Sequence, residues 1–206
     1  ISRTPLGFVL QPRELSDGMT IPFDGYHVRA FASRHNTLGL GYILTEDERP
    51  GRFDREKAIS LGVPPGPLFG CLQRGESVII ESNGTRTEVT PDQILGPPRP
   101  GRKVVYTGDT RPYFRGWAEY AMGADLLIHD ATYDNSEADR ARDVYHSTAG
   151  EAATVACEIK AECLALVHIS SRYTGTKTHI EDAKEYYTGE VIAPDDLEMI
   201  EITYRS

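Results

Sequence analysis

The chain has 206 residues, of which 39% are apolar and 26% charged, and its formal net charge is −9. These proportions are typical of one globular domain or part of a larger one, and they exclude a disordered or collagen-like chain. No apolar run approaches the roughly 20 residues that cross a bilayer, so no membrane span is expected. The three cysteines are too few for a disulfide framework, which predicts a cytoplasmic location. Because the first residue is Ile1 rather than Met, we expect that the natural N-terminus is missing.

The first half of the chain predicts strands followed by an irregular insertion. Residues 25–33 alternate between polar and apolar, and residues 38–45 form a second extended run. Residues 46–75 are dense in proline, glycine and charge, which predicts an excursion with one short helix over 54–61 rather than core. Residues 76–89 contain an Asn-Gly pair that is typical of a tight hairpin turn.

The second half alternates short apolar strands with helical patterns. Thr148-x-x-Glu151 is a capping box that predicts a helix reaching about residue 161, and Thr178-x-x-Glu181 predicts a second helix. The alternation indicates a mixed α/β fold with helices layered on a sheet. The strand candidates are residues 104–107, 126–129, 164–169, 191–193 and 197–204.

Three of these strands end in polar side chains. Asp109, the pair His129-Asp130, and His168 each follow or close an apolar strand. In layered α/β folds the chemistry gathers beyond the carboxyl ends of the strands. Imidazole and carboxylate together suit zinc, manganese or iron, so these side chains are candidate metal ligands.

Two further histidines lie in loops. His146 directly precedes the capped helix, where the positive end of the helix dipole favours neutral imidazole. A neutral histidine there could hold a phosphate oxygen or act in proton transfer. His35 lies between the first two strands and by itself carries little information.

Several motifs together resemble ribonuclease Z, a family of tRNA 3′-processing endonucleases in the metallo-β-lactamase superfamily. The resemblance extends over nearly the whole chain, and its most specific parts are a proline-glycine block, a His-Ser-Thr-Ala box and a His-x-Ser-x-Arg-Tyr box. The matching segments are residues 39–42, 47–54, 61–68, 72–75, 106–112, 129–133, 146–149 and 168–173.

The resemblance implies a four-layered αβ/βα sandwich of the metallo-β-lactamase type that holds two zinc ions. Asp109 matches the bridging carboxylate, and His35 and His168 match metal ligands. His146 matches a histidine that assists proton transfer or holds the scissile phosphate. Asp130 stands where the family box has a longer glutamate, which shortens the reach of that acid.

The resemblance also implies a substrate and a way to bind it. Residues 46–75 match a flexible arm that grips tRNA away from the cut site, and the family acts on precursor tRNA as a homodimer. Arginine and lysine in or near that arm would meet phosphates even though the whole chain is acidic. The candidate substrate-binding residues are Arg49, Arg52, Arg55, Lys57 and Arg74.

One departure from the family concerns its His-x-His-x-Asp-His motif, which this chain lacks. We therefore expect that residues 1–206 are the C-terminal two-thirds of the domain and that the fold is incomplete at its N-terminus. The leading expectation is a zinc-dependent endoribonuclease that removes the 3′ trailer of precursor tRNA. The alternatives are an inactive half-domain that binds RNA or a subunit, and a metal-dependent phosphodiesterase acting on small esters.

Overall fold

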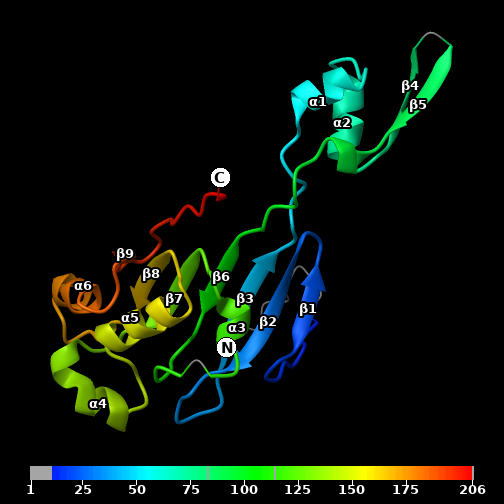
Figure 1. Ribbon diagram of the computed structural model, residues 1–206. Coiled ribbons are helices and arrows are strands. Elements are labelled where there is room, and N and C mark those ends of the chain that lie inside the picture. The colour runs from blue at the N-terminus through cyan, green and yellow to red at the C-terminus, as the bar shows by residue number, and fades with distance from the viewer. Residues whose placement is uncertain (1–10, 83, 114, 206) are drawn as a thin grey trace, which may run out of the picture. The chain divides into compact units, whose positions relative to one another are not determined.

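The computed structural model describes residues 11–82, 84–113 and 115–205, which divide between two compact units (Figure 1). The first unit comprises the described part of Ile1–Thr45 together with Arg102–Thr203. The second comprises Glu46–Gly101 with the described part of Tyr204–Ser206. None of the described helices is long and apolar enough to cross a membrane.

The first unit is built on a seven-stranded sheet in the order β1-β2-β3-β6-β7-β8-β9. Strands β1 and β2, and strands β3 and β6, pair antiparallel, whereas β6 through β9 pair in parallel. The parallel strands are the short apolar runs of the sequence, as expected for strands in a buried sheet. The strands are β1 (Thr20–Phe23), β2 (Tyr26–Ala32), β3 (Leu40–Glu46), β6 (Lys103–Tyr106), β7 (Leu126–Asp130), β8 (Cys163–Val167) and β9 (Glu190–Ile192).

Helices cover one face of this sheet (Figure 1). Alternate strand residues point to that face, among them Ile43, Val105, Leu127 and Leu164, and all four are almost fully buried. The alanine-rich side of α5 packs on them, which brings the helix close to the sheet. The helices of the unit are α3 (Ala118–Ala121), α4 (Ala138–Asp143), α5 (Ala149–Glu158) and α6 (Lys177–Lys184), with a 3₁₀ turn at Asn135–Glu137.

The opposite face of the sheet also carries apolar side chains. Tyr42 pairs with Tyr106 and Leu44 with Val104 across the antiparallel β3–β6 ladder. Tyr106 is 45% exposed, and the other three are half-buried. Apolar side chains on both faces are typical of a sheet in a layered sandwich.

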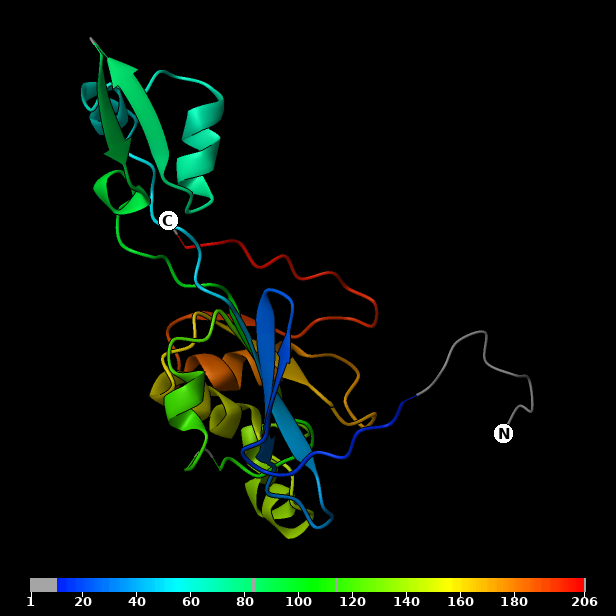
Figure 2. The ribbon, with the colours of Figure 1, turned by 90° about the vertical axis from the view of Figure 1, so that its right-hand side faces the viewer.

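The second unit has a small hydrophobic core of its own. Helix α2 lies beside the β4–β5 hairpin (Figure 2). Ala58, Val63, Leu72, Val78 and Val89 are nearly inaccessible to solvent. The elements are α1 (Arg55–Ser60), α2 (Pro67–Gln73), β4 (Val78–Ser82), β5 (Thr85–Val89) and a 3₁₀ turn at Pro91–Gln93.

This unit differs from the insertion expected over residues 46–75, because it continues to Gly101. The expectation that its composition cannot form core was wrong. Leu72 is supplied by the irregular stretch, but Val78, Val89 and Ile94 come from the hairpin and its continuation, so the core closes only when both parts fold together. The hairpin lies where it was predicted, with Asn83 of its turn outside the described residues.

Both helices predicted for the first unit form, whereas one predicted cap and one predicted strand do not. The capping box of Thr148 and Glu151 opens α5 as predicted. Thr178 does not cap a helix, because α6 begins at Lys177 with Thr176 as its N-cap. Residues 197–204 form no strand: Leu197 is fully exposed and has a positive φ of 68°, which breaks the extended backbone there.

Candidate metal centre

The carboxyl ends of β6, β7 and β8 meet at one edge of the sheet. These strands are parallel and in register, with Val105 opposite Leu127 and Asp130 opposite Val167. Asp109 follows β6 by three residues, Asp130 closes β7, and His168 comes directly after β8. Parallel pairing therefore brings together polar residues that lie 21 to 59 positions apart in the sequence.

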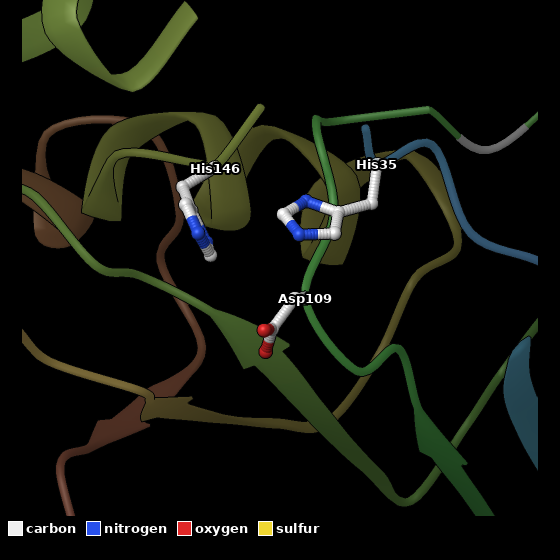
Figure 3. A group of neighbouring side chains, drawn as sticks. All are labelled: His35, Asp109 and His146. Atoms are coloured by element: carbon white, nitrogen blue, oxygen red, sulfur yellow. The ribbon is translucent and has the colours of Figure 1, made fainter. Parts of the chain in front are cut away.

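Two loops add His35 and His146 to this edge. His35, Asp109 and His146 point toward one another from three separate segments (Figure 3). The ring centroids of His35 and His146 lie 4.9 Å apart, and those of His146 and His168 lie 5.0 Å apart. His168 Nε2 lies 3.7 Å from Asp109 Oδ1. The four residues assigned by the resemblance thus form one cluster.

Hydrogen bonds fix the same tautomer in all three histidines. His35 Nδ1 lies 3.0 Å from the carbonyl of Tyr145, and a carbonyl can only accept. His146 Nδ1 lies 2.8 Å from Asp130 Oδ2, also an acceptor. The hydroxyl of Thr132 donates to Asp130, so it accepts from Nδ1 of His168 at 2.8 Å. Each ring therefore carries its proton on Nδ1 and keeps the lone pair of Nε2 for a metal or a proton.

Asp130 is the centre of this network. Its carboxylate is fully buried and accepts four hydrogen bonds. Oδ2 accepts from the Thr110 amide and from His146, while Oδ1 accepts from the amide and the hydroxyl of Thr132. Asp130 thus orients His146 directly and His168 through Thr132. Although aspartate is shorter than the glutamate of the family box, the carboxylate of Asp130 reaches His146.

Two residues at the site have unusual backbone angles. His168 has φ of 60° and Tyr145, directly before His146, has φ of 64°. Non-glycine residues in this region cost on the order of 1–3 kcal/mol, which the surrounding contacts must offset. Such angles turn the chain sharply after β8 and before α5, and so direct the two imidazoles toward the strand ends.

The cluster offers two overlapping sets of metal ligands among the described residues. The first is His35, Asp109 and His146, and the second is Asp130, His146 and His168; within each set the ligand atoms lie within 4.8 Å of one another. Two imidazoles with one carboxylate are a donor set that suits zinc, iron or manganese. His146 belongs to both sets, although the resemblance places it outside the ligand shell.

A second, buried layer supports these side chains, and only part of it was foreseen. Burial lowers the pKa of His129, whose side chain is fully inaccessible and donates from Nδ1 to the carbonyl of Asp130. Thr110, Arg111 and Thr132 were not singled out from the sequence. They lie near a strand-end aspartate and within the matching segments 106–112 and 129–133, but neither signal reveals the partners that they find across the fold.

The predicted substrate-binding residues all lie in the second unit. Arg49, Arg52 and Arg99 line one groove of about 560 Å³, and Arg52 also lines a second groove with Lys57. Arg49 is anchored by stacking on Tyr204, with its guanidinium carbon 3.6 Å from the ring centroid. Arg74 pairs with Glu76 at 3.1 Å, which reduces its availability for a phosphate. Arg55 begins α1 and is exposed.

Comparison with known proteins agrees with this fold and site. Residues 82–169 match the family model described as the beta-lactamase superfamily domain. Human tRNase Z, short form, has a TM-score of 0.53 at 23% identity, covering 89% of this chain and 46% of that one. The metallo-β-lactamase fold protein YhfI from Bacillus subtilis has a TM-score of 0.53 at 15% identity, covering 86% and 50% of the two chains. The fold is the metallo-β-lactamase fold, as expected, although of the four expected layers the described residues form one large sheet with helices on one face.

Curated sequences narrow the resemblance further. Ribonuclease Z of Halorubrum lacusprofundi is 54% identical over 182 residues, covering 88% of this chain and 57% of that protein. Ribonuclease Z of Haloferax volcanii is 48% identical, covering 96% and 62%, and that of Methanosarcina acetivorans is 46% identical, covering 97% and 64%. The chain is therefore a relative of ribonuclease Z, and it spans about three fifths of the length of these curated proteins.

Proposed function

We propose that this chain carries the catalytic edge of a zinc-dependent endoribonuclease that removes the 3′ trailer from precursor tRNA. The proposal rests on one observation: His35, Asp109, His146 and His168 lie in one cluster. In each histidine of this cluster, Nε2 is available to a metal or a proton. The similarity to ribonuclease Z proteins supports the substrate.

The donor set fits a divalent transition metal. His35 and Asp109 share one candidate ligand set, and His168 Nε2 lies 3.7 Å from Asp109 Oδ1, so these three residues would supply ligands. The remaining positions require donors from elsewhere, because two ions need more than three residues. A bound metal pair would supply Lewis acidity and lower the pKa of bound water toward neutrality. The carboxylate of Asp109 would reduce the repulsion between two neighbouring cations.

His146 has a distinct role in this proposal. Asp130 keeps the proton of His146 on Nδ1, so Nε2 is the atom that can accept a proton and later return it to the leaving oxygen. Only 15% of the His146 side chain is exposed, which limits competition from bulk water. In its protonated form the ring could also hold a phosphate oxygen.

The second unit would bind the tRNA substrate. Its grooves present Arg49, Arg52 and Arg99, and phosphate contacts by such residues are strongly salt-dependent. Contacts made by a unit that holds none of the catalytic residues contribute binding energy to a large RNA and none to a small ester.

The experiment compares two substrates after removal of this unit. Thr45 pairs with Lys103 in the β3–β6 ladder, so a short Gly-Ser linker from Thr45 to Arg102 can replace residues 46–101 while keeping every residue pair of that ladder. For precursor tRNA we expect KM to rise at least tenfold and its salt dependence to flatten. Hydrolysis of a small chromogenic phosphodiester should stay within about twofold of the intact protein.

The same experiment separates the alternatives. If the intact, zinc-loaded protein binds precursor tRNA but cleaves neither substrate, the chain is an inactive binding module. If removal of the unit leaves tRNA cleavage unchanged, the reason for proposing tRNA rather than small esters as the substrate is removed. A Lys57→Gln variant serves as the milder control, because it removes one exposed charge from the lining of a groove and retains the whole unit.

A further inference from the structure

The guanidinium of Arg111 is largely buried behind the site, with only 12% of its side chain exposed. Nη1 donates to the carbonyl of His146 and, at 2.9 Å, to Oε2 of Glu151. Nη2 donates to Oε1 of the same carboxylate. Arg111 therefore forms a two-pronged ion pair with Glu151 while holding the backbone of the residue that would move the proton.

Glu151 is at the same time part of the helix cap. It is the third residue of α5, and its Oε2 accepts from the Thr148 amide at 2.9 Å. In return the hydroxyl of Thr148 accepts from the Glu151 amide at 3.2 Å. One carboxylate thus fixes both the start of α5 and the guanidinium of Arg111.

The segment that contains His146 depends on these contacts. Residue 145 has a positive φ, and the chain from there to Thr148 spans one turn between α4 and α5. The Ser147 hydroxyl donates to the carbonyl of Thr110 at 2.6 Å, so Thr110 and Arg111 hold two successive residues of this turn. Two adjacent anchors restrict the direction in which the imidazole of His146 points.

The backbone of Arg111 makes a separate contact with the loop of His35. Its amide donates to the carbonyl of Arg34 at 2.8 Å, and this bond does not involve the side chain. Replacing the side chain should therefore leave the backbone of Arg34 in place while loosening His146 and the adjacent Tyr145 carbonyl, to which His35 donates. The two effects can be measured independently in one protein.

We propose that Arg111, paired with Glu151, is a positioning residue for His146. It acts on the backbone carbonyl of His146 and on the cap of α5, and it contacts neither metal nor substrate. The catalytic consequence rests on the proposed function, whereas the structural consequence, a displaced His146 beside an undisturbed Arg34 backbone, does not. The role requires the charged pair and not only a hydrogen-bonding side chain.

The test uses three variants of the protein as encoded, with one matched control. Arg111→Met removes the guanidinium while keeping much of its apolar stem. Arg111→Lys retains the charge but loses the two-pronged geometry. Glu151→Gln keeps a side chain able to form the capping box but removes the charge. Arg142→Met is the control, because Arg142 forms an exposed pair with Asp139 on α4.

We expect kcat for precursor tRNA to fall about 10- to 100-fold in Arg111→Met and Glu151→Gln, the range seen for residues that orient a site from behind. KM should stay within about twofold, and Arg111→Lys should lie between the wild type and Arg111→Met. In ¹⁵N NMR spectra of the metal-free protein, the amide and ring signals of His146 should shift, and the amide signal of Arg34 should not. Arg142→Met should change none of these.

The outcomes distinguish failure of the inference from failure of the proposed function. If the wild type cleaves no precursor tRNA but the His146 signals shift selectively, the function is wrong and the positioning role stands. If folded Arg111→Met and Glu151→Gln keep wild-type kcat and His146 signals, the positioning role is wrong. Equal shifts at Arg34 and His146 would mean that the pair supports the whole edge, which also overturns the proposal. Circular dichroism melting identifies any unfolded variant.

Discussion

Asp130 Oδ2 and His146 Nδ1 lie 2.8 Å apart, and the aspartate is completely buried where the imidazole is not. A buried carboxylate that accepts from Nδ1 sets the tautomer and the ring plane of a histidine whose other nitrogen faces the site. The relationship joins the end of β7 to the turn before α5. It makes the acid a structural partner of the site and not one of the groups that reach the substrate.

Asp130→Asn should lower kcat about 10- to 100-fold with little effect on KM. Asparagine keeps one acceptor oxygen and replaces the other with an NH2 donor, so two donors lose their acceptor: either Thr110 and His146, or the amide and hydroxyl of Thr132. Steady-state cleavage of precursor tRNA measures the effect, and Asp139→Asn on the exposed surface of α4 is the control. Unchanged kcat in a folded Asp130→Asn protein would contradict the orienting role.

Asp109→Ala should abolish cleavage and reduce the bound metal while the fold persists. The side chain is 43% exposed and adds nothing to the core, so its loss removes a ligand and not packing. Its absence would leave two cations without a shared anion. Metal analysis after dialysis, together with a melting curve, checks both halves of the prediction. Near wild-type turnover would show that Asp109 does not bridge the metals.

His146→Ala and His168→Ala should differ in which quantity they change. Loss of His146 should lower kcat by at least about 100-fold while most of the metal stays bound, because proton transfer contributes about 10²–10⁴-fold. Loss of His168 should lower metal content first, and activity with it. Zinc titration of both variants beside the wild type makes the comparison. Equal zinc loss would assign His146 to the ligand shell, as its place in both ligand sets allows.

His179 should make the fold sensitive to mild acid. Its ring is fully buried and packs edge-on against Tyr173 at 4.5 Å, and burial lowers its pKa, with nearby Asp134 and Asp182 opposing that shift. A folded pKa below the unfolded value of about 6.5 means that the unfolded chain binds more protons. The free energy of unfolding should therefore be fully retained above about pH 6.5 and fall as the pH drops below it.

Urea unfolding at several pH values measures this contribution. His179→Phe should flatten the decline between pH 6.5 and the folded pKa. His129 is also buried, with a lowered pKa, so the wild-type slope contains both histidines and only the difference between the curves reports His179. Parallel curves for wild type and His179→Phe would show that His179 does not contribute.

Sequence by itself determined the local elements of this protein. Apolar runs with turn residues between them gave the strands from β6 to β9, and reciprocal side-chain pairing gave the start of α5 at Thr148. It also placed Asp109 and His168 beyond strand ends. These features depend on contacts between residues a few positions apart, which a linear pattern records.

The tertiary structure decided which of these residues meet and in what state. Parallel register aligns the ends of β6, β7 and β8, and only then does Asp130 collect donors from residues 110, 132 and 146. The ion pair of Arg111 with Glu151 joins positions 40 apart, and the core of the second unit joins Leu72 to Val89. Partners at such separations are selected by packing of the whole fold, because no local preference of the chain distinguishes one distant donor from another.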